Sequence, residues 1–180
     1  MRSDLSPGEW AVLALVAEGQ THGWAVARVL SPAGEVGAVW TFPRALVYRA
    51  IDTLHAAGLV EEVGSEAGSR GPRRTIVAVT AGGSARVREW LATPVVPVRD
   101  VRSLLLLKLL FVHRADGDAG PLLEAQRGAL LPIEARLAAA HAGSSGAERM
   151  LALFRLESTR AVGRFVEGLL AERSTAAGGF

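Results

Sequence analysis

The sequence predicts a mainly α-helical fold in two domains, with a single β-hairpin in the first. Hydrophobic residues recur at helical spacing through most of the 180 residues and give way to β-branched runs only once. Pro94 and Pro97 then interrupt the chain, because proline lacks the backbone N–H that a helix needs. We therefore expect a first domain at residues 1–93, an α-helical domain at residues 98–172 and a flexible tail at residues 173–180.

The first domain opens with two predicted helices. Ser6 and Pro7 are typical of a helix start, with Ser6 as the N-cap and Pro7 in the first turn. Gly19 ends this helix after a series of apolar residues at helical spacing. Thr21 is expected to cap a second, short helix that runs through Leu30.

The third helix has two distinct faces. It begins near residues 41–43 and stops at Gly58, in the manner of a helix with a C-cap glycine. Its inner face consists of the apolar residues Leu46, Val47, Ala50, Ile51 and Leu54. The opposite side, which has no core to pack against, carries Arg44, Tyr48, Arg49 and Asp52.

A β-hairpin and a fourth helix complete the first domain. Residues 59–63 and 75–79 are predicted to be its strands, and residues 64–72, rich in glycine, serine and proline, its loop. Thr80 is expected to cap the fourth helix, which ends near Thr93. The order of helix, helix, helix, strand, strand and helix is that of a winged helix-turn-helix domain.

Three helices are predicted in the second domain, near residues 98–114, 121–141 and 146–172. Residues 104–112 are apolar on almost every side, so they need cover on every side. Three helices of one chain seldom provide that cover, and a second copy of the chain is the simplest source of it. We therefore expect a homodimer, with the interface candidates Leu104, Leu107, Leu110, Leu151, Phe154, Phe165 and Leu169.

Composition and missing motifs exclude several classes of function. The absence of cysteine removes disulfides and thiolate nucleophiles, and the histidines lack metal-ligand spacing. The sequence has no phosphate-binding glycine loop and no nucleophile elbow, so we expect no enzyme, cofactor or metal. No apolar run is long enough to span a bilayer and no secretory leader precedes Leu5, so a cytoplasmic location without membrane contact is expected.

The arginines gather where a winged helix meets DNA. A guanidinium can bind guanine with two hydrogen bonds or hold a phosphate, and a tyrosine can reach a phosphate or a base edge. The formal net charge is only +2, so local placement of charge, and not its total, predicts double-stranded DNA as the partner. The candidate DNA contacts are Thr41, Arg44, Ala45, Tyr48, Arg49, Arg70, Arg73 and Arg74.

Two other interpretations remain open from the residues alone. The arginines could be an ordinary solvated surface, in which case the winged helix would be a protein-interaction module. Such a module could lose its arginines and still function, whereas a DNA-binding domain could not, so replacing the arginines distinguishes the two. The C-terminal helices could instead be the scaffold of an enzyme, but neither residues 104–112 nor 151–170 hold a cluster of polar side chains.

Several short motifs over residues 5–93 resemble the PadR family of transcriptional regulators. They are Thr21-His22-Gly23-Trp24, Leu46-Val47-Tyr48-Arg49-Ala50-Ile51, Ala57-Gly58-Leu59-Val60, Gly71-Pro72-Arg73-Arg74 and Val79-Thr80-Ala81-Gly82-Gly83. A weaker resemblance continues over residues 99–110 and Gln126-Arg127. Family members often carry Gly-Thr-Leu-Tyr-Pro where this chain has Ala45-Leu46-Val47-Tyr48-Arg49, so their base preference does not carry over.

The resemblance implies a winged-helix repressor that dimerises through C-terminal helices, and in some members a small aromatic effector that releases the DNA. A dimer presents two recognition helices, so we expect the operator to be an inverted repeat. The four tryptophans are interpreted as core residues, since a tryptophan in a helix is usually packed. Trp90, on the linker side of the fourth helix, is the best of the four for lining an effector pocket.

Overall fold

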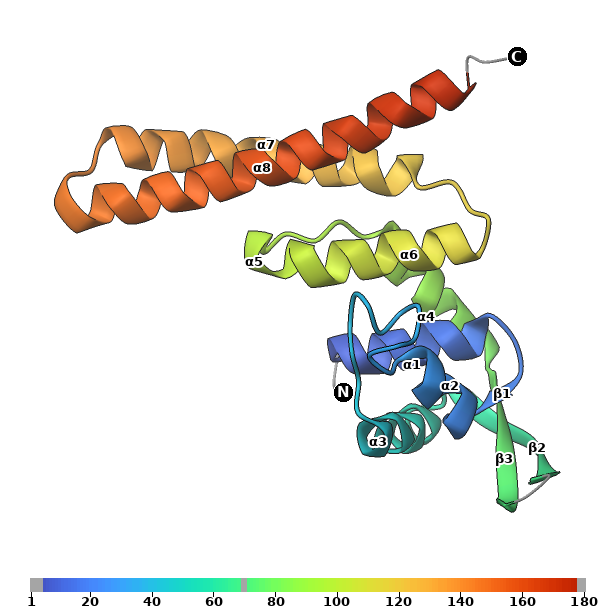
Figure 1. Cartoon of the computed structure of the whole chain (residues 1–180). Coiled ribbons are helices and arrows are strands. Elements are labelled where there is room, and N and C mark those ends of the chain that lie inside the picture. The colour runs from blue at the N-terminus through green and yellow to red at the C-terminus, as the bar shows by residue number, and fades with distance from the viewer. Residues whose placement is uncertain (1–4, 69–70, 178–180) are drawn as a thin grey trace. The chain divides into compact units, whose positions relative to one another are not determined.

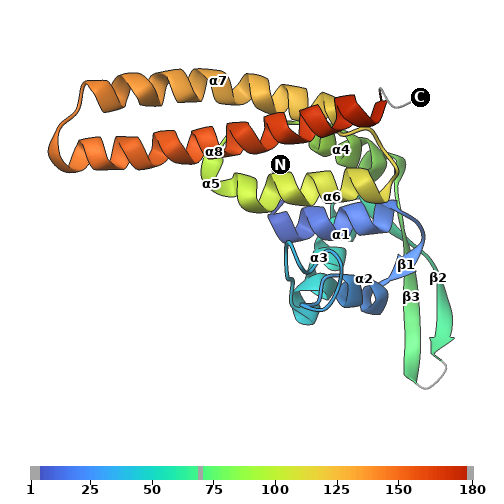
Figure 2. The same cartoon turned by 45° about the horizontal axis from the view of Figure 1, so that its top comes forward.

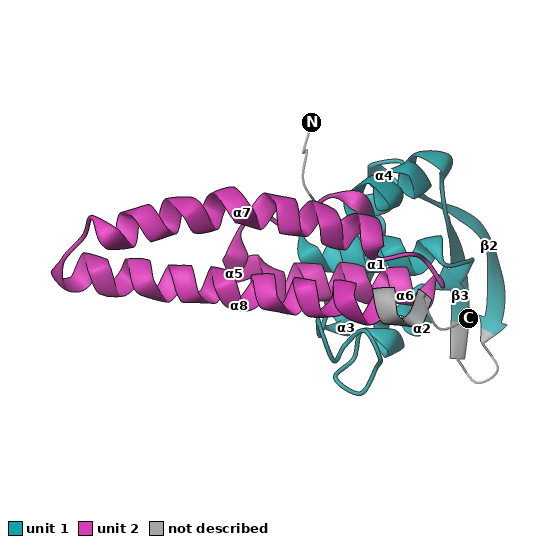
Figure 3. Cartoon of the chain, turned by 90° about the horizontal axis from the view of Figure 1, so that it is seen from above, with its two compact units in different colours: residues 1–91 teal, residues 92–180 magenta. Residues whose placement is uncertain are grey.

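The computed structural model describes residues 5–68 and 71–177. The fold is mainly helical with one small three-stranded sheet (Figure 1), as the sequence predicts. The chain divides into two compact units, Met1–Leu91 and Ala92–Phe180, coloured teal and magenta in Figure 3. Within the described part of the chain, no helix is both long and apolar enough to cross a membrane.

The first half of unit 1 holds three helices: α1 (Pro7–Ala17), α2 (Gly23–Val29) and α3 (Arg44–Ala56). Ser6 caps α1 as predicted, since its hydroxyl accepts the Glu9 N–H while the Glu9 carboxylate accepts the Ser6 N–H. Gly58 follows α3 with a φ of +70°, the left-handed conformation in which a C-cap glycine ends a helix.

The start of α2 differs from the prediction. Thr21 does not cap this helix, because Thr21 and His22 form a short strand, β1 (Thr21–His22), that belongs to the sheet. The cap is the His22 ring, whose Nδ1 accepts the N–H of Ala25 at 3.1 Å. A strand of two residues shows no alternation of side chains, so the sequence pattern does not reveal it.

The sheet is antiparallel, in the order β1–β3–β2, with β2 at Val60–Gly68 and β3 at Gly71–Val79. Its hairpin is longer than predicted, because Gly68 pairs with Gly71 inside residues 64–72, the segment expected to be a loop. β1 pairs with β3 only at Ile76 and Val77. The part of the hairpin beyond them, Gly64–Gly68 of β2 and Gly71–Thr75 of β3, is a two-stranded ribbon, here named the wing (Figure 2).

The glycine and serine residues of the wing explain why the sequence predicts a loop where the structure has paired strands. They are typical of loops, but a ribbon exposed to solvent needs only paired backbones and tolerates small polar side chains. The ladder accommodates them through register shifts between Glu62 and Gly64 and between Glu66 and Gly68.

Helix α4 (Ala81–Ala92) begins as predicted at Thr80, whose hydroxyl accepts the N–H of Gly83 at 3.0 Å. Trp90 of α4 stacks on Trp10 of α1, with ring centroids 5.0 Å apart and an interplanar angle of 5°. Both rings are buried, as the interpretation of the tryptophans as core residues requires. That interpretation is wrong for Trp24, which is exposed.

Unit 2 contains α5 (Val98–Asp100), the π-helix η1 (Val101–Leu105), α6 (Leu106–Arg114), α7 (Gly120–Ala142) and α8 (Gly146–Ala177). The first three form one helical segment at the predicted position, and α7 and α8 lie side by side as an antiparallel pair (Figure 1). Helix α8 runs beyond the predicted end at residue 172, so the expected tail overlaps the helix, and residues 178–180 lie outside the described part.

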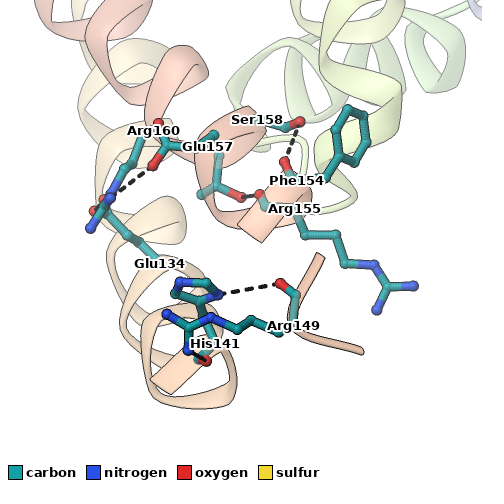
Figure 4. Close-up of polar contacts among 9 residues, drawn as sticks. Glu134, His141, Arg149, Phe154, Arg155, Glu157, Ser158 and Arg160 are labelled. Atoms are coloured by element: carbon teal, nitrogen blue, oxygen red, sulfur yellow. Dashed lines mark hydrogen bonds and ion pairs between the residues drawn. The ribbon is translucent and has the colours of Figure 1, made fainter. Parts of the chain in front are cut away.

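A core of valine and leucine residues from the linker, η1, α7 and α8 fills unit 2. The polar side chain of Gln126 is fully buried in unit 2, and its amide makes two hydrogen bonds with the backbone of Val95. The buried amide thereby fixes the proline-flanked linker onto α7. Ion pairs and hydrogen bonds add to the α7–α8 contact at the surface, where Arg160 joins Glu134 of α7 to Glu157 of α8 (Figure 4).

Candidate nucleic-acid interface

The outer face of α3 presents the polar side chains that the sequence predicts. Arg44, Tyr48, Arg49 and Asp52 are all exposed, whereas Val47, Ala50 and Leu54 are buried on the opposite side. Leu46 departs from the predicted inner face and is exposed, in the first turn of α3. The guanidinium carbon of Arg44 lies 5.7 Å from the centroid of the Tyr48 ring, so the two side chains form one surface.

The wing supplies the second group of basic side chains. Arg73 and Arg74 lie on β3, and Arg70 lies outside the described residues. Arg73 donates to the Ser65 hydroxyl of β2 at 2.7 Å, which holds its guanidinium over the ribbon. Arg74 lies 3.8 Å from the Glu66 carboxylate and 3.4 Å from the His22 ring.

The two groups meet around one hollow of about 300 Å³. Arg44, Tyr48 and Asp52 line it from α3, and Arg73 and Arg74 line it from the wing. Its remaining lining comes from His22, Gly23, Trp24, Ile51, Glu62, Thr75 and Val77. A surface of this kind offers guanidinium, hydroxyl and imidazole donors to an anionic partner.

Three predicted contacts do not line the hollow. Ala45 and Arg49 of α3 are exposed, as is Thr41 in the connection before the helix. The Thr41 hydroxyl donates to the Gly37 carbonyl at 2.8 Å, so it also stabilises the connection that precedes α3.

Sequence reasoning missed Trp24 as part of this surface and Glu66 as the carboxylate that lies near Arg74. A tryptophan in a helical segment is usually packed, which favoured a core position for Trp24. The arginine four residues later, Arg28, is the signal that could have revealed it, because residues at that spacing share one side of a helix.

The candidate dimer contacts divide into three groups by their exposure to solvent. Leu151, Phe154 and Phe165 of α8 are exposed and line an apolar groove of about 910 Å³ together with Val98, Leu106 and Leu137. The Phe154 ring is 71% exposed and extends away from the α7 contacts in Figure 4. Leu104, Leu110 and Leu169 are half-buried. Leu107 is completely buried within the single chain, so it offers no surface to a partner, which corrects that prediction.

Trp90, the candidate effector contact, is packed against Trp10 and almost fully buried. An effector site at Trp90 stays a prediction, and it would require the two stacked rings to separate or to present an edge.

Comparison with known proteins identifies one family: the transcriptional regulator PadR-like family matches residues 12–89, which include α3 and the wing. No curated protein shows significant similarity to the chain.

Three solved structures share low identity with the chain. PadR of Bacillus subtilis in complex with operator DNA is 16% identical, with a TM-score of 0.47, covering 95% of this chain and 99% of that one. The protein smu.1604c of Streptococcus mutans is 11% identical, with a TM-score of 0.43, and covers 91% and 98%. The PadR-like transcriptional regulator BC1756 of Bacillus cereus is 17% identical, with a TM-score of 0.40, and covers 94% and 99%.

Proposed function

We propose, from the PadR-like transcriptional regulator domain that residues 12–89 form, that this chain binds double-stranded operator DNA and regulates transcription. One observation carries the proposal: α3 and the wing, distant in sequence, bring Arg44, Tyr48, Arg73 and Arg74 to the same hollow. In a winged helix-turn-helix domain these two elements are the ones that approach the duplex.

The position of each side chain suggests its role. Arg44 is the first residue of α3, and the N-terminal part of a recognition helix is what reaches base edges in the major groove. Arg49, on the same outer face, is assigned to the base edges as well, with Thr41 and Ala45 flanking these contacts. Tyr48 and the wing arginines are assigned to phosphates, which position the domain without reading sequence.

We propose that the DNA-binding form is a homodimer. The groove lined by Leu151, Phe154 and Phe165 leaves large apolar side chains in water, which is unusual for a surface without a partner. A dimer in which a second copy of the chain covers this groove would contain two α3 helices, one from each copy. The operator would then be an inverted repeat with half-sites about one helical turn, roughly 34 Å, or a multiple of it apart.

Repression and release by a small aromatic effector are the finer parts of the proposal, and the PadR resemblance supports them. Such a regulator works where the chromosome is, so we place it in the cytoplasm. The test adds small aromatic acids, alcohols and amines to a preformed operator complex and measures DNA release by fluorescence anisotropy. Release by one compound, weakened by Trp90→Phe, is the expected result; retention of DNA with every compound contradicts the effector proposal.

Selection from random duplexes tests DNA binding itself. The wild-type chain, Arg44→Ala, Arg49→Ala and the control Arg88→Ala are each used to enrich duplexes, since Arg88 is exposed on α4 and does not line the hollow. The wild type and Arg88→Ala should recover the same inverted repeat. Loss of a bidentate contact to guanine costs about 1–3 kcal/mol, so each α3 variant should lose roughly 10- to 100-fold in preference.

Two outcomes contradict parts of this proposal. If both α3 variants recover the wild-type repeat with unchanged relative affinity, Arg44 and Arg49 hold phosphate only and shape readout selects the operator. If the wild type enriches no duplex at all, the winged helix is a protein-interaction module.

A further inference from the structure

Trp24 occupies an unusual position for a tryptophan in a small helix. Helix α2 packs through Gly23, Val26 and Ala27, which are buried, whereas Trp24 lies on the other side and is 38% exposed. Its ring contributes to the hollow that α3 and the wing share. A large aromatic side chain that faces water in a functional surface needs another explanation than core packing.

Two guanidinium groups lie against the Trp24 ring. The guanidinium carbon of Arg28, four residues later on α2, is 5.1 Å from the ring centroid, and that of Arg74 on the wing is 5.0 Å away. Both distances are within the range of about 6 Å in which a cation is attracted to an aromatic face. Trp24 therefore links two positive charges that come from different elements.

The two arginines differ in their electrostatic surroundings. The His22 Nδ1 accepts the Ala25 N–H, so in the neutral ring Nε2 carries the proton and can donate to Glu66 at 3.2 Å. The same Glu66 oxygen lies 3.8 Å from Arg74 and offsets part of its charge. Arg28 has no carboxylate partner among the described residues, and its side chain is exposed, so its charge is fully available.

We propose that Arg28 is a further phosphate contact of the DNA surface and that Trp24, whose ring also contacts Arg74, is a positioning residue that holds the Arg28 guanidinium in place. This inference rests on the proposed function, because it assigns α2 to the duplex that α3 and the wing bind. A guanidinium stacked on a ring keeps its N–H edge free for an anion, and the stack reduces the freedom that phosphate binding would otherwise remove. In helix-turn-helix domains the helix before the recognition helix crosses the DNA backbone, which is where this charge lies.

The salt dependence of DNA binding tests the proposal. Each phosphate contact that is lost should reduce the slope of log affinity against log salt by about 0.9. The full-length chain, Arg28→Ala, Trp24→Leu, Trp24→Phe and the control Arg88→Ala are titrated with the selected operator at several salt concentrations. Arg28→Ala and Trp24→Leu should each lower the slope, whereas Trp24→Phe, which keeps an aromatic face, and Arg88→Ala should leave it unchanged.

The outcomes of these titrations distinguish a failure of the Arg28 and Trp24 proposal from a failure of the proposed function. An unchanged slope in Arg28→Ala, with wild-type DNA binding intact, overturns the phosphate contact while leaving the proposed function in place. A normal slope in Trp24→Leu, with only a lower unfolding midpoint, overturns the positioning role and makes Trp24 a structural residue. Failure of the wild type to bind any duplex contradicts the proposed function itself.

Discussion

The Tyr48 ring of α3 packs directly on the backbone of Gly23 at the start of α2. A Cβ atom added to Gly23 would lie 2.7 Å from Cε1 of Tyr48, closer than two carbon atoms approach without a shift. Glycine at this position permits the close approach of the Tyr48 ring, and it thereby sets the orientation of a side chain on the proposed DNA surface.

Gly23→Ala should displace Tyr48 and weaken operator binding without much loss of stability, because the clashing atoms belong to a surface ring that can move. A hydrogen bond to a charged group contributes about 1.5–3 kcal/mol, so the loss of a Tyr48–phosphate contact predicts a decrease in affinity of at least roughly tenfold. Anisotropy titration measures the affinity and urea unfolding the stability. Gly128→Ala, where a Cβ meets nothing within 4 Å, is the control and should keep full affinity; equal affinity in both variants would contradict the prediction.

The sequence predicts the helices of this protein well and its sheet less well. Capping residues such as Ser6 and Thr80, and the apolar spacing of α3, are local signals that the structure reproduces. Strand β1 is too short to show a pattern, and its formation depends on pairing with β3, far along the chain. The π-helix at η1 also has no local signal that we recognise in residues 101–105.

The sequence likewise predicts some residues of the candidate site and misses others. Spacing along α3 places Arg44, Tyr48 and Arg49 on the outer face, because helical periodicity alone decides which side a residue occupies. The contact between Trp24 and Arg74 joins α2 to the wing, and only the folded chain brings these elements together. Periodicity of the leucine-rich helix likewise did not reveal that Leu107 is already buried within one chain.

Replacement of Phe154 or Phe165 by Glu should convert the proposed dimer to monomers. A carboxylate in the apolar groove would have to be desolvated against Leu151 and Leu106, and burial of an aromatic side chain contributes about 1.5–3 kcal/mol. The dimer dissociation constant should rise by at least roughly tenfold for each variant. Light scattering at micromolar concentration measures the mass, with Val63→Glu, an exposed site on β2 in unit 1, as the control. A wild-type chain that is monomeric under these conditions would overturn the dimer proposal.

Gln126→Leu should destabilise unit 2 by about 2–4 kcal/mol, because it leaves two buried backbone groups without partners. The Gln126 side chain accepts the Val95 N–H at 2.7 Å and donates to the Val95 carbonyl at 2.9 Å. Leucine fills a similar volume but provides neither bond. Urea unfolding gives the change in stability, and Arg127→Ala, which removes only an exposed ion pair with Glu124, should cost less than about 1 kcal/mol. A loss in Gln126→Leu no larger than in this control would show that the linker does not depend on the amide.

Lys108 is a further polar side chain whose burial has a measurable consequence. It is 3% exposed, and its ammonium group donates to the Thr93 carbonyl at 2.5 Å. Burial disfavours the charged form and lowers the pKa of Lys108 from 10.5 to about 8. At a pH between about 8 and 10.5, the Lys108 side chain therefore carries a proton in the unfolded chain and has released it in the folded chain.

The free energy of unfolding should therefore rise as the pH increases from about 8 to 10.5, relative to a variant that lacks this amine. A difference of about 2.5 pKa units corresponds to roughly 3 kcal/mol at 1.36 kcal/mol per unit, and below pH 8 the cost of the buried charge is fully present. Lys108→Met keeps the length of the side chain and removes the titration. Urea unfolding of both chains from pH 7 to pH 10.5 gives the difference between their free energies of unfolding. The other titrating groups are the same in both chains, so their contributions cancel in this difference. Parallel curves for the two chains would mean that Lys108 keeps an ordinary pKa in the folded protein.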